Sequence, residues 1–124
     1  MKNKNIIIII VLFIISFFAV LWIKSSGQPG ELDQFAECLG KNGAVFYGTF
    51  WCSHCQNQKA LFGKSAKRLP YVECSTPDGQ RQSAFCKDKN IESYPTWEFN
   101  DGSRLSGEIS LTQLAEKTGC PLPQ

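Results

Sequence analysis

The chain has 124 residues, of which 13 are basic and 11 acidic, for a formal net charge of +2. This length allows one small domain and little else. Three of the lysines flank the apolar amino-terminal segment, so the rest of the chain has 10 basic and 11 acidic residues and a net charge of −1. No basic surface remains there for a nucleic acid.

The first element is an apolar run over residues 6–23, broken only by Ser16 and free of charge. As a helix its 18 residues span roughly 27 Å, near the lower limit for crossing a bilayer. A signal peptide has a shorter apolar core, and Ser25-Ser26-Gly27 is only a weak cleavage site. We therefore expect residues 1–24 to be an uncleaved membrane anchor. A cleaved signal peptide and a buried core helix are the alternatives.

The charges around this run predict its orientation. Lys2 and Lys4 precede it, and Lys24 alone follows it closely. The positive-inside rule then places the amino terminus in the cytoplasm and the rest of the chain in the periplasm or another extracytoplasmic space.

The remaining chain is predicted to form a linker over residues 25–30 and one domain over residues 31–124. The first predicted elements are a helix over 31–39, a buried strand over 44–50 and a helix from the Cys52–Cys55 pair to about 68. A strand over 71–74 and a short helix over 82–87 follow, and then two strands over 96–99 and 104–106 joined by Asn100-Asp101-Gly102. The last helix has a capping box at Ser110 and Gln113 and ends at Gly119. A parallel first half thus joins an antiparallel hairpin, which predicts an α/β sandwich with helices on the faces of a mixed sheet.

Apolar side chains of this domain are expected in its core. In the helix after the cysteine pair, Ala60, Leu61 and Ala66 are available for burial. The aromatic residues expected in the core are Phe46, Tyr47, Phe50, Phe62, Phe85, Trp97 and Phe99.

All six cysteines follow the apolar run: Cys38, Cys52, Cys55, Cys74, Cys86 and Cys120. An even, dense set in a short exported domain indicates disulfide bonds and an oxidising compartment, whereas the same set in a cytosolic protein would indicate a metal site. The cysteines therefore support the orientation inferred from the lysines.

Cys52 and Cys55 form a C-x-x-C pair at the start of a predicted helix. Disulfide exchange needs one exposed thiolate and a second thiol close enough to resolve the mixed disulfide. The helix amino terminus favours an anion on Cys52, which we expect to be the nucleophile, with Cys55 as the shielded resolving thiol. His54 between them is expected to stabilise the thiolate, and Trp51 is expected to shape substrate docking. The alternative is half of a zinc site, but no second closely spaced cysteine pair is present.

These motifs resemble the thioredoxin superfamily. The matching parts are the strand over 44–50, Trp51-Cys52-x-x-Cys55 and Tyr94-Pro95-Thr96. The resemblance implies a cis Pro95 beside the cysteine pair, where the backbone around Tyr94 and Pro95 docks an extended substrate, and it implies no metal or diffusible cofactor.

A closer resemblance, over most of residues 35–120, is to the thioredoxin-like domain fused to bacterial and plant homologues of vitamin K epoxide reductase. It is carried by Phe46-Tyr47-Gly48-Thr49-Phe50-Trp51-Cys52, Gln58-Lys59-Ala60-Leu61-Phe62-Gly63, Leu69-Pro70-Tyr71-Val72-Glu73-Cys74 and Tyr94-Pro95-Thr96-Trp97. In that family the domain passes electrons from secreted proteins to a quinone-reducing membrane partner. One apolar segment stands here in place of the four-helix quinone-binding part, so the resemblance implies the thiol chemistry on protein thiols. A separate quinone-reducing membrane partner is a hypothesis.

Two departures from thioredoxins bear on the direction of electron flow. Phe46 stands where thioredoxins have a buried acid, and Ser53-His54 replaces Gly-Pro between the cysteines. The histidine is shared with strong periplasmic oxidants of this fold, although their long helical insertion has no room here. We favour an oxidase, with a reductase or isomerase as the alternative.

The other four cysteines are expected to be structural. Cys74 and Cys86 are close enough for a local bridge, while Cys38 and Cys120 would close nearly the whole domain into one loop. The sequence leaves the connectivity open, and free thiols or a relay to the active pair are alternatives. A function of a different class, a disulfide-stabilised binding module with an idle pair, also fits the sequence.

Overall fold

The computed structural model describes residues 2–26 and 29–124, with the backbone alone for residues 2 and 24–26. Helix α1 (Lys2–Ser26) contains the apolar run. Its stretch Asn3–Ile23 is long and apolar enough to cross a membrane, a test that a signal sequence also passes. The large apolar side chains of this helix are exposed, and that of Trp22 is 82% exposed. The predicted linker, residues 25–30, lies partly outside the described residues.

The domain that follows is built on a four-stranded mixed sheet of order β2-β1-β3-β4. Its strands are β1 (Val45–Gly48), β2 (Tyr71–Glu73), β3 (Thr96–Glu98) and β4 (Arg104–Ser106). Strand β1 pairs in parallel with β2 and antiparallel with β3, and β3 pairs antiparallel with β4. The predicted parallel half and antiparallel hairpin are therefore both confirmed.

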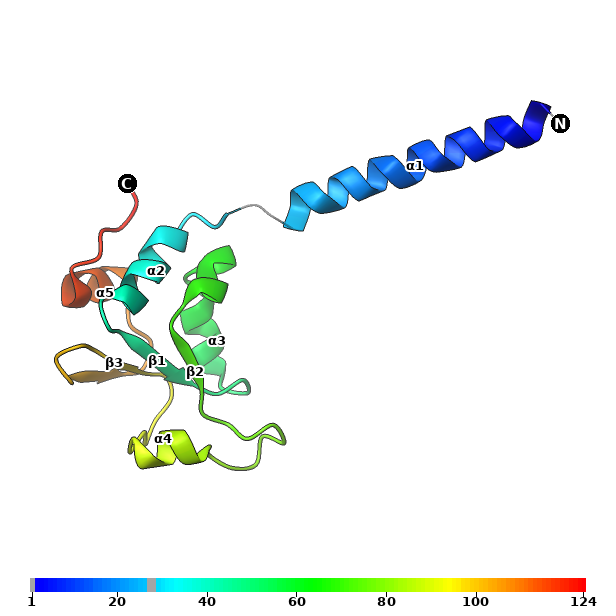
Figure 1. Ribbon diagram of the computed structural model, residues 1–124. Helices are drawn as coiled ribbons and strands as arrows, with labels where there is room; N and C mark the ends of the chain where they lie inside the picture. The colour runs from blue at the N-terminus through cyan, green and yellow to red at the C-terminus, as the bar shows by residue number, and fades with distance from the viewer. Residues whose placement is uncertain (1, 27–28) are drawn as a thin grey trace.

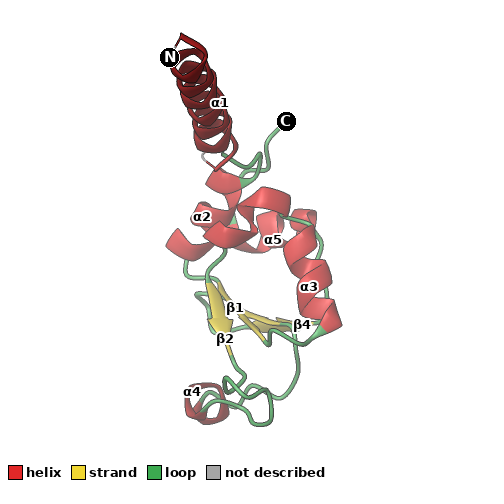
Figure 2. Cartoon of the chain, turned by 90° about the vertical axis from the view of Figure 1, so that its right-hand side faces the viewer, coloured by secondary structure: helices red, strands yellow, loops and turns green. Residues whose placement is uncertain are grey.

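Helices cover the two faces of the sheet unequally. Helices α2 (Asp33–Lys41), α3 (Ser53–Ala60) and α5 (Leu111–Thr118) lie on one side, and the short α4 (Ala84–Asp88) lies on the other (Figures 1 and 2). The larger core packs Leu39 of α2, Cys55 of α3 and Leu114 of α5 against the sheet. There the rings of Phe46 and Trp97 stack with their centroids 4.8 Å apart. A smaller cluster beneath α4 contains Tyr47, Cys74, Cys86 and Ile91.

The last helix begins and ends where the sequence predicts. The Ser110 hydroxyl accepts a hydrogen bond from the Gln113 N–H, and the Gln113 side chain accepts one from the Ser110 N–H, which completes the capping box. Gly119 ends the helix with φ +72°, in the left-handed region that favours glycine.

The helix predicted from the cysteine pair to residue 68 is wrong in its second half. It stops at Ala60 and resumes after a turn as the 3₁₀ helix η1 (Gly63–Arg68). Gly63 has φ +51°, which breaks the α-helical conformation. The turn shifts the buried face, so Phe62 stacks on Phe35 while Ala60 and Leu61 are exposed, against the prediction.

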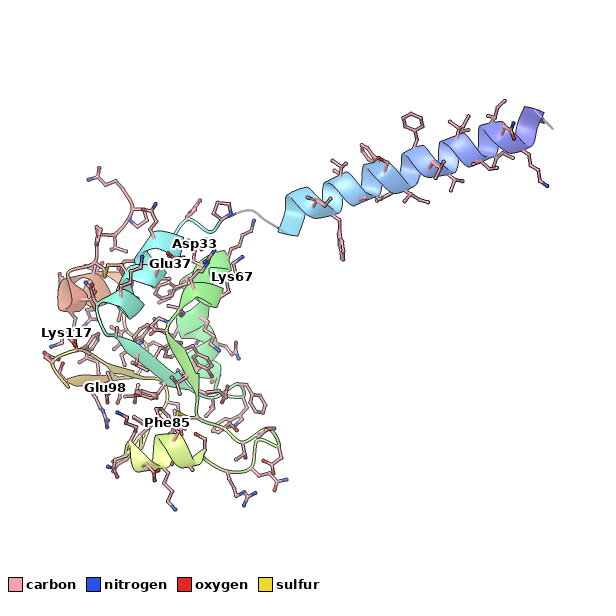
Figure 3. The ribbon with its side chains drawn as sticks, in the orientation of Figure 1. Asp33, Glu37, Lys67, Phe85, Glu98 and Lys117 are labelled. Carbon is pink, nitrogen blue, oxygen red and sulfur yellow. A yellow bond between two sulfur atoms is a disulfide. The ribbon has the colours of Figure 1, made fainter. Side chains whose placement is uncertain are left out.

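The turn also lets η1 pack on α2. The Ser65 hydroxyl, fully buried, accepts a hydrogen bond from the Leu32 N–H at 3.0 Å. Arg68 pairs with Asp33 and Glu37 of α2, and Lys67 lies on the same side (Figure 3).

Two of the aromatic residues predicted in the core lie on the surface instead. Phe50 is 49% exposed and Phe85, on α4, is 55% exposed (Figure 3). Phe50 lies just outside strand β1, and Phe85 lies at the free face of the five-residue helix α4. At either place too little structure is available to cover a phenyl ring.

Two disulfide bonds close the domain. One joins Cys38 of α2 to Cys120 after α5, with 82 residues of sequence separation. The other joins Cys74 to Cys86 across 12 residues and ties the loop after β2 to α4. Both pairings are those considered from the sequence.

We expect the long-range bridge to contribute more stability than the local one. In the loop-entropy model the loss on reduction is about 4.5 kcal/mol for the Cys38–Cys120 loop and about 3 kcal/mol for the Cys74–Cys86 loop. Urea unfolding of the full chain should therefore show a larger loss for Cys38→Ala/Cys120→Ala than for Cys74→Ala/Cys86→Ala. Equal losses would show that the unfolded chain is already compact enough to cancel the loop-length effect.

Candidate active site

Cys52 lies at the amino-terminal cap of α3, directly after the turn that leaves β1. Its backbone has φ −77° and ψ 117°, and its Sγ accepts a hydrogen bond from the Cys55 N–H at 3.3 Å. The sulfur thus takes the position that a capping oxygen usually takes, where helix N–H groups and the helix dipole favour a negative charge. This is the position that the sequence predicts for a nucleophilic cysteine.

Cys55 lies one turn further into α3 and is fully buried. Burial, followed by the hydrogen bond with Cys52, raises the pKa of the Cys55 thiol to about 12. This thiol is therefore protonated at neutral pH until it takes part in exchange. Cys52 and Cys55 are the two free cysteines of the chain.

The loop before β3 forms the next wall of the site. The Tyr94–Pro95 peptide bond is cis, and Pro95 is fully buried. The Cys52 thiol donates to the Tyr94 carbonyl oxygen at 3.7 Å. The structure therefore brings the loop predicted for docking next to the predicted nucleophile.

Trp51 stands beside this loop with its ring 57% exposed. Its ring meets that of Tyr94 edge-on, 6.4 Å between centroids, and its Nε1–H donates to the Ser75 hydroxyl at 3.1 Å. These contacts hold the indole beside the cysteine pair while more than half of the residue stays exposed.

His54 contacts a residue that sequence reasoning missed. Its Nδ1 lies 2.7 Å from Oε1 of Glu108, which also accepts a hydrogen bond from Asn57 at 3.0 Å. The bond from Asn57, and then that from His54, hold the pKa of Glu108 below its usual value. In the described part of the chain the imidazole has no hydrogen bond to the Cys52 sulfur, so any effect on the thiolate acts through space.

Glu108 is brought to α3 by a second missed residue, Gln58. This fully buried side chain donates to the Ile109 carbonyl at 3.0 Å and accepts from the Ile109 N–H at 2.7 Å. The pair of bonds clamps the segment before α5 onto the active-site helix. A separation of 51 residues gave the sequence no periodic signal for this contact.

Metal ligands do not gather at this site. Within residues 2–26 and 29–124 no group of three or more His, Cys, Asp or Glu side chains comes together as a metal site. Four of the six cysteines are bonded in two pairs, so their sulfurs are not free thiolates in this structure.

Gly48, at the end of β1, is a third residue that sequence reasoning did not single out. A Cβ there would stand 2.9 Å from Cε2 of Tyr71 and 3.0 Å from the Cys55 sulfur. Glycine therefore lets Cys55 and the neighbouring strand approach each other closely.

We expect Gly48→Ala to displace Cys55 or Tyr71 and to destabilise the chain by about 1–3 kcal/mol, the usual cost of overpacking. Urea unfolding measures the loss, and alkylation of the reduced protein measures the change at Cys55. Gly40→Ala is the matched control, because its Cβ would meet Pro70 at a tolerable 3.4 Å inside a helix. A Gly48→Ala protein as stable as the Gly40→Ala protein would contradict this packing argument.

Comparison with known proteins agrees with this geometry. The thioredoxin family model matches residues 33–118, from the first residue of α2 to the last of α5. The chain is 49% identical over 107 residues to the thiol-disulfide oxidoreductase LTO1 of Arabidopsis thaliana, covering 82% of this chain and 28% of the relative. It is 29% identical over 104 residues to the protein disulfide-isomerase erp38 of Neurospora crassa, covering 73% of this chain and 28% of the relative.

The chain thus spans about a quarter of the length of each of these relatives. The family match covers the sheet, the helix that carries both free cysteines and the cis-proline loop. With its α/β fold of a mixed sheet flanked by helices, this chain belongs to the thioredoxin family.

Proposed function

We propose that this protein is a thiol–disulfide oxidoreductase that acts on protein thiols and disulfides through Cys52 and Cys55. The observation that carries the proposal is the Cys52 sulfur at the amino terminus of α3, within reach of the Tyr94 carbonyl, with Cys55 protonated and buried one turn below. The names of the two relatives support the same class of reaction.

The atoms and electrons of the exchange balance with the two cysteine sulfurs and the substrate thiols alone. When the oxidised pair accepts electrons, a substrate thiolate attacks the Cys52 Sγ, the Cys52–Cys55 bond breaks, and Cys55 leaves as a thiolate that is then protonated. A second substrate thiolate attacks the substrate sulfur of the mixed disulfide and releases Cys52. Two electrons pass to the pair, and the substrate gains one disulfide.

Substrate docking is assigned to Trp51, Tyr94 and Pro95. An extended substrate can hydrogen-bond the backbone around the cis proline while one face of the Trp51 indole covers it. The exposure of this ring and its fixed orientation against Ser75 and Tyr94 support that assignment.

For the direction we propose an oxidase. A positive or hydrogen-bonding group near Cys52 stabilises the reduced form, which makes the disulfide a stronger oxidant. His54 is such a group, and its contact with Glu108 holds the imidazole next to the cysteine pair. A reductase or isomerase of the same fold is the alternative, and the isomerase name of one relative favours testing it.

We further propose that α1 anchors the domain in a membrane, with the domain on the extracytoplasmic side. The two disulfides and the charge distribution around the apolar run support this placement. The resemblance to domains fused to vitamin K epoxide reductase homologues makes a quinone-reducing membrane protein the proposed redox partner.

The reduction potential of the Cys52–Cys55 pair tests the direction. Glutathione equilibration followed by alkylation and mass analysis of the full chain should give a value well above the value of about −270 mV for thioredoxin. His54→Ala should lower it by about 30 mV, which is a tenfold change in the exchange equilibrium.

A potential at or below that of thioredoxin would contradict the oxidase and favour a reductase. Cys52→Ser is the negative control for the whole function. If the Cys52→Ser protein keeps the function in cells, the chain is a binding module with an idle pair.

The anchor is tested by fractionation. We expect the full chain to stay in the membrane pellet after an alkaline wash, because about 20 apolar residues hold a helix in the bilayer. A variant without residues 2–23 should be released. Protease added to intact spheroplasts should degrade the domain. A soluble, shortened mature chain would instead identify a cleaved signal peptide.

A further inference from the structure

One side of Cys55 faces residues that the exchange described above does not use. The Cys55 sulfur and Cε2 of Tyr71 lie 3.0 Å and 2.9 Å from the same point, the position that a Cβ on Gly48 would occupy. The sulfur and the tyrosine ring therefore face each other across the gap that Gly48 leaves in β1.

A cation lies over this ring. The Nζ of Lys59 lies 3.4 Å from the centroid of the Tyr71 ring, well within the range of a cation–π interaction. Lys59 follows Cys55 by four residues on α3, so both side chains leave the helix on one face. Lys59 is half-buried, which preserves more of its field than full exposure to water would.

Tyr71 is itself held in place. Its hydroxyl donates to Oε2 of Glu73 at 2.7 Å. The other carboxylate oxygen, Oε1, accepts from the Ser75 N–H at 2.9 Å and from the Phe50 N–H at 3.3 Å. Backbone donors thus fix Glu73, Glu73 fixes the ring, and the ring holds the ammonium group near the resolving cysteine.

Exchange in either direction passes through an anionic Cys55, which burial disfavours. Five titratable groups interact with this sulfur or with the ring beside it: Cys52 and Lys59 from α3, Tyr71 and Glu73 from β2, and Tyr94 before β3. Lys59 is the cation among them, and its charge lowers the pKa of Cys55 against the effect of burial.

We propose that Lys59, held over the Tyr71 ring, is the group that stabilises the Cys55 thiolate during exchange, with Tyr71 and Glu73 as its positioning residues. The inference rests on the proposed function and deepens it. When a substrate thiolate attacks Cys52, the electron pair of the broken disulfide moves to the Cys55 sulfur beside Lys59, and water then supplies its proton. In the reverse reaction Cys55 gives its proton to water, attacks Cys52 and expels the substrate sulfur as a thiolate.

A single-thiol protein tests this directly. Cys52→Ser leaves Cys55 as the one free thiol, because the other four cysteines are bonded in pairs. The rate at which a neutral alkylating agent modifies Cys55 in the full chain at pH 8, where a lysine is a cation, reports the thiolate fraction of Cys55. Adding Lys59→Met should lower this fraction about tenfold, as expected for the loss of one nearby opposite charge, and the alkylation rate about threefold, because a more basic thiolate is a better nucleophile.

Two further variants separate this role from packing and from net charge. Lys59→Arg keeps a cation that stacks on aromatic rings and should keep the alkylation rate of the Cys52→Ser protein. Lys64→Met removes an exposed lysine of η1 and should also leave this rate unchanged. The inference is wrong if Lys59→Met leaves the alkylation rate where it was, or if Lys64→Met lowers it as much.

The positioning role of Tyr71 has its own test in the same background. Tyr71→Phe keeps the ring but loses its bond to Glu73, so it should lower the alkylation rate less than Tyr71→Leu, which should lower it as Lys59→Met does. The double variant of Lys59→Met and Tyr71→Leu should show no further loss, because both changes remove one interaction. Additive losses would overturn the positioning role, and thermal unfolding verifies that each variant is folded.

Failure of the proposed function can be distinguished from failure of the inference by measuring exchange itself. With both active cysteines present, Lys59→Met should slow resolution of a mixed disulfide about threefold, because a more basic thiolate is a better nucleophile and offsets part of its lower population. A wild-type pair that never exchanges would refute the proposed function whatever Lys59 does. Normal exchange in the wild type, with unchanged rates of resolution and of Cys55 alkylation in Lys59→Met, would refute the inference alone.

Discussion

The pairing of β1 with strands on both sides is the constraint on which the site depends. Because β1 pairs with β2 on one side and β3 on the other, the turn after Gly48 emerges between the strand that carries Tyr71 and the loop that carries Pro95. Helix α3 therefore starts between these two walls, with Cys52 against the proline loop and Cys55 against the gap over Gly48. Shifting the register of β1 by one residue would turn Gly48 away and close that gap.

The two cysteines differ because their surroundings differ, although they lie three residues apart on one helix. Cys52 receives a backbone N–H and has a neighbouring carbonyl as a partner for its thiol, whereas Cys55 loses its water to the core. The same burial that keeps Cys55 protonated also places it beside Tyr71 and Lys59. A resolving thiol can then be shielded from unwanted partners and still form an anion when the neighbouring bond is attacked.

The outer parts of the domain hold these walls in place. The Cys38–Cys120 bond joins the first and last helices of the domain, and Gln58 ties the segment before α5 to the active-site helix. The Cys74–Cys86 bond fixes the loop whose Ser75 orients Trp51. A domain of about 100 residues has a small core, so covalent and buried polar ties of this kind stabilise a site that packing alone would leave mobile.

The sequence by itself determined the order of elements, the mixed sheet, the last helix with its two caps, and the placement of Cys52 and Cys55 at a helix start, because each depends on residues close together in the chain. Only the tertiary structure decided which groups meet across 16 to 54 residues: Glu108 at His54, Gln58 at Ile109 and Tyr71 at Cys55. It also decided that the helix breaks at Gly63 and that Phe50 and Phe85 stay exposed. Periodicity reports which face of an element is apolar, but not which neighbour covers that face.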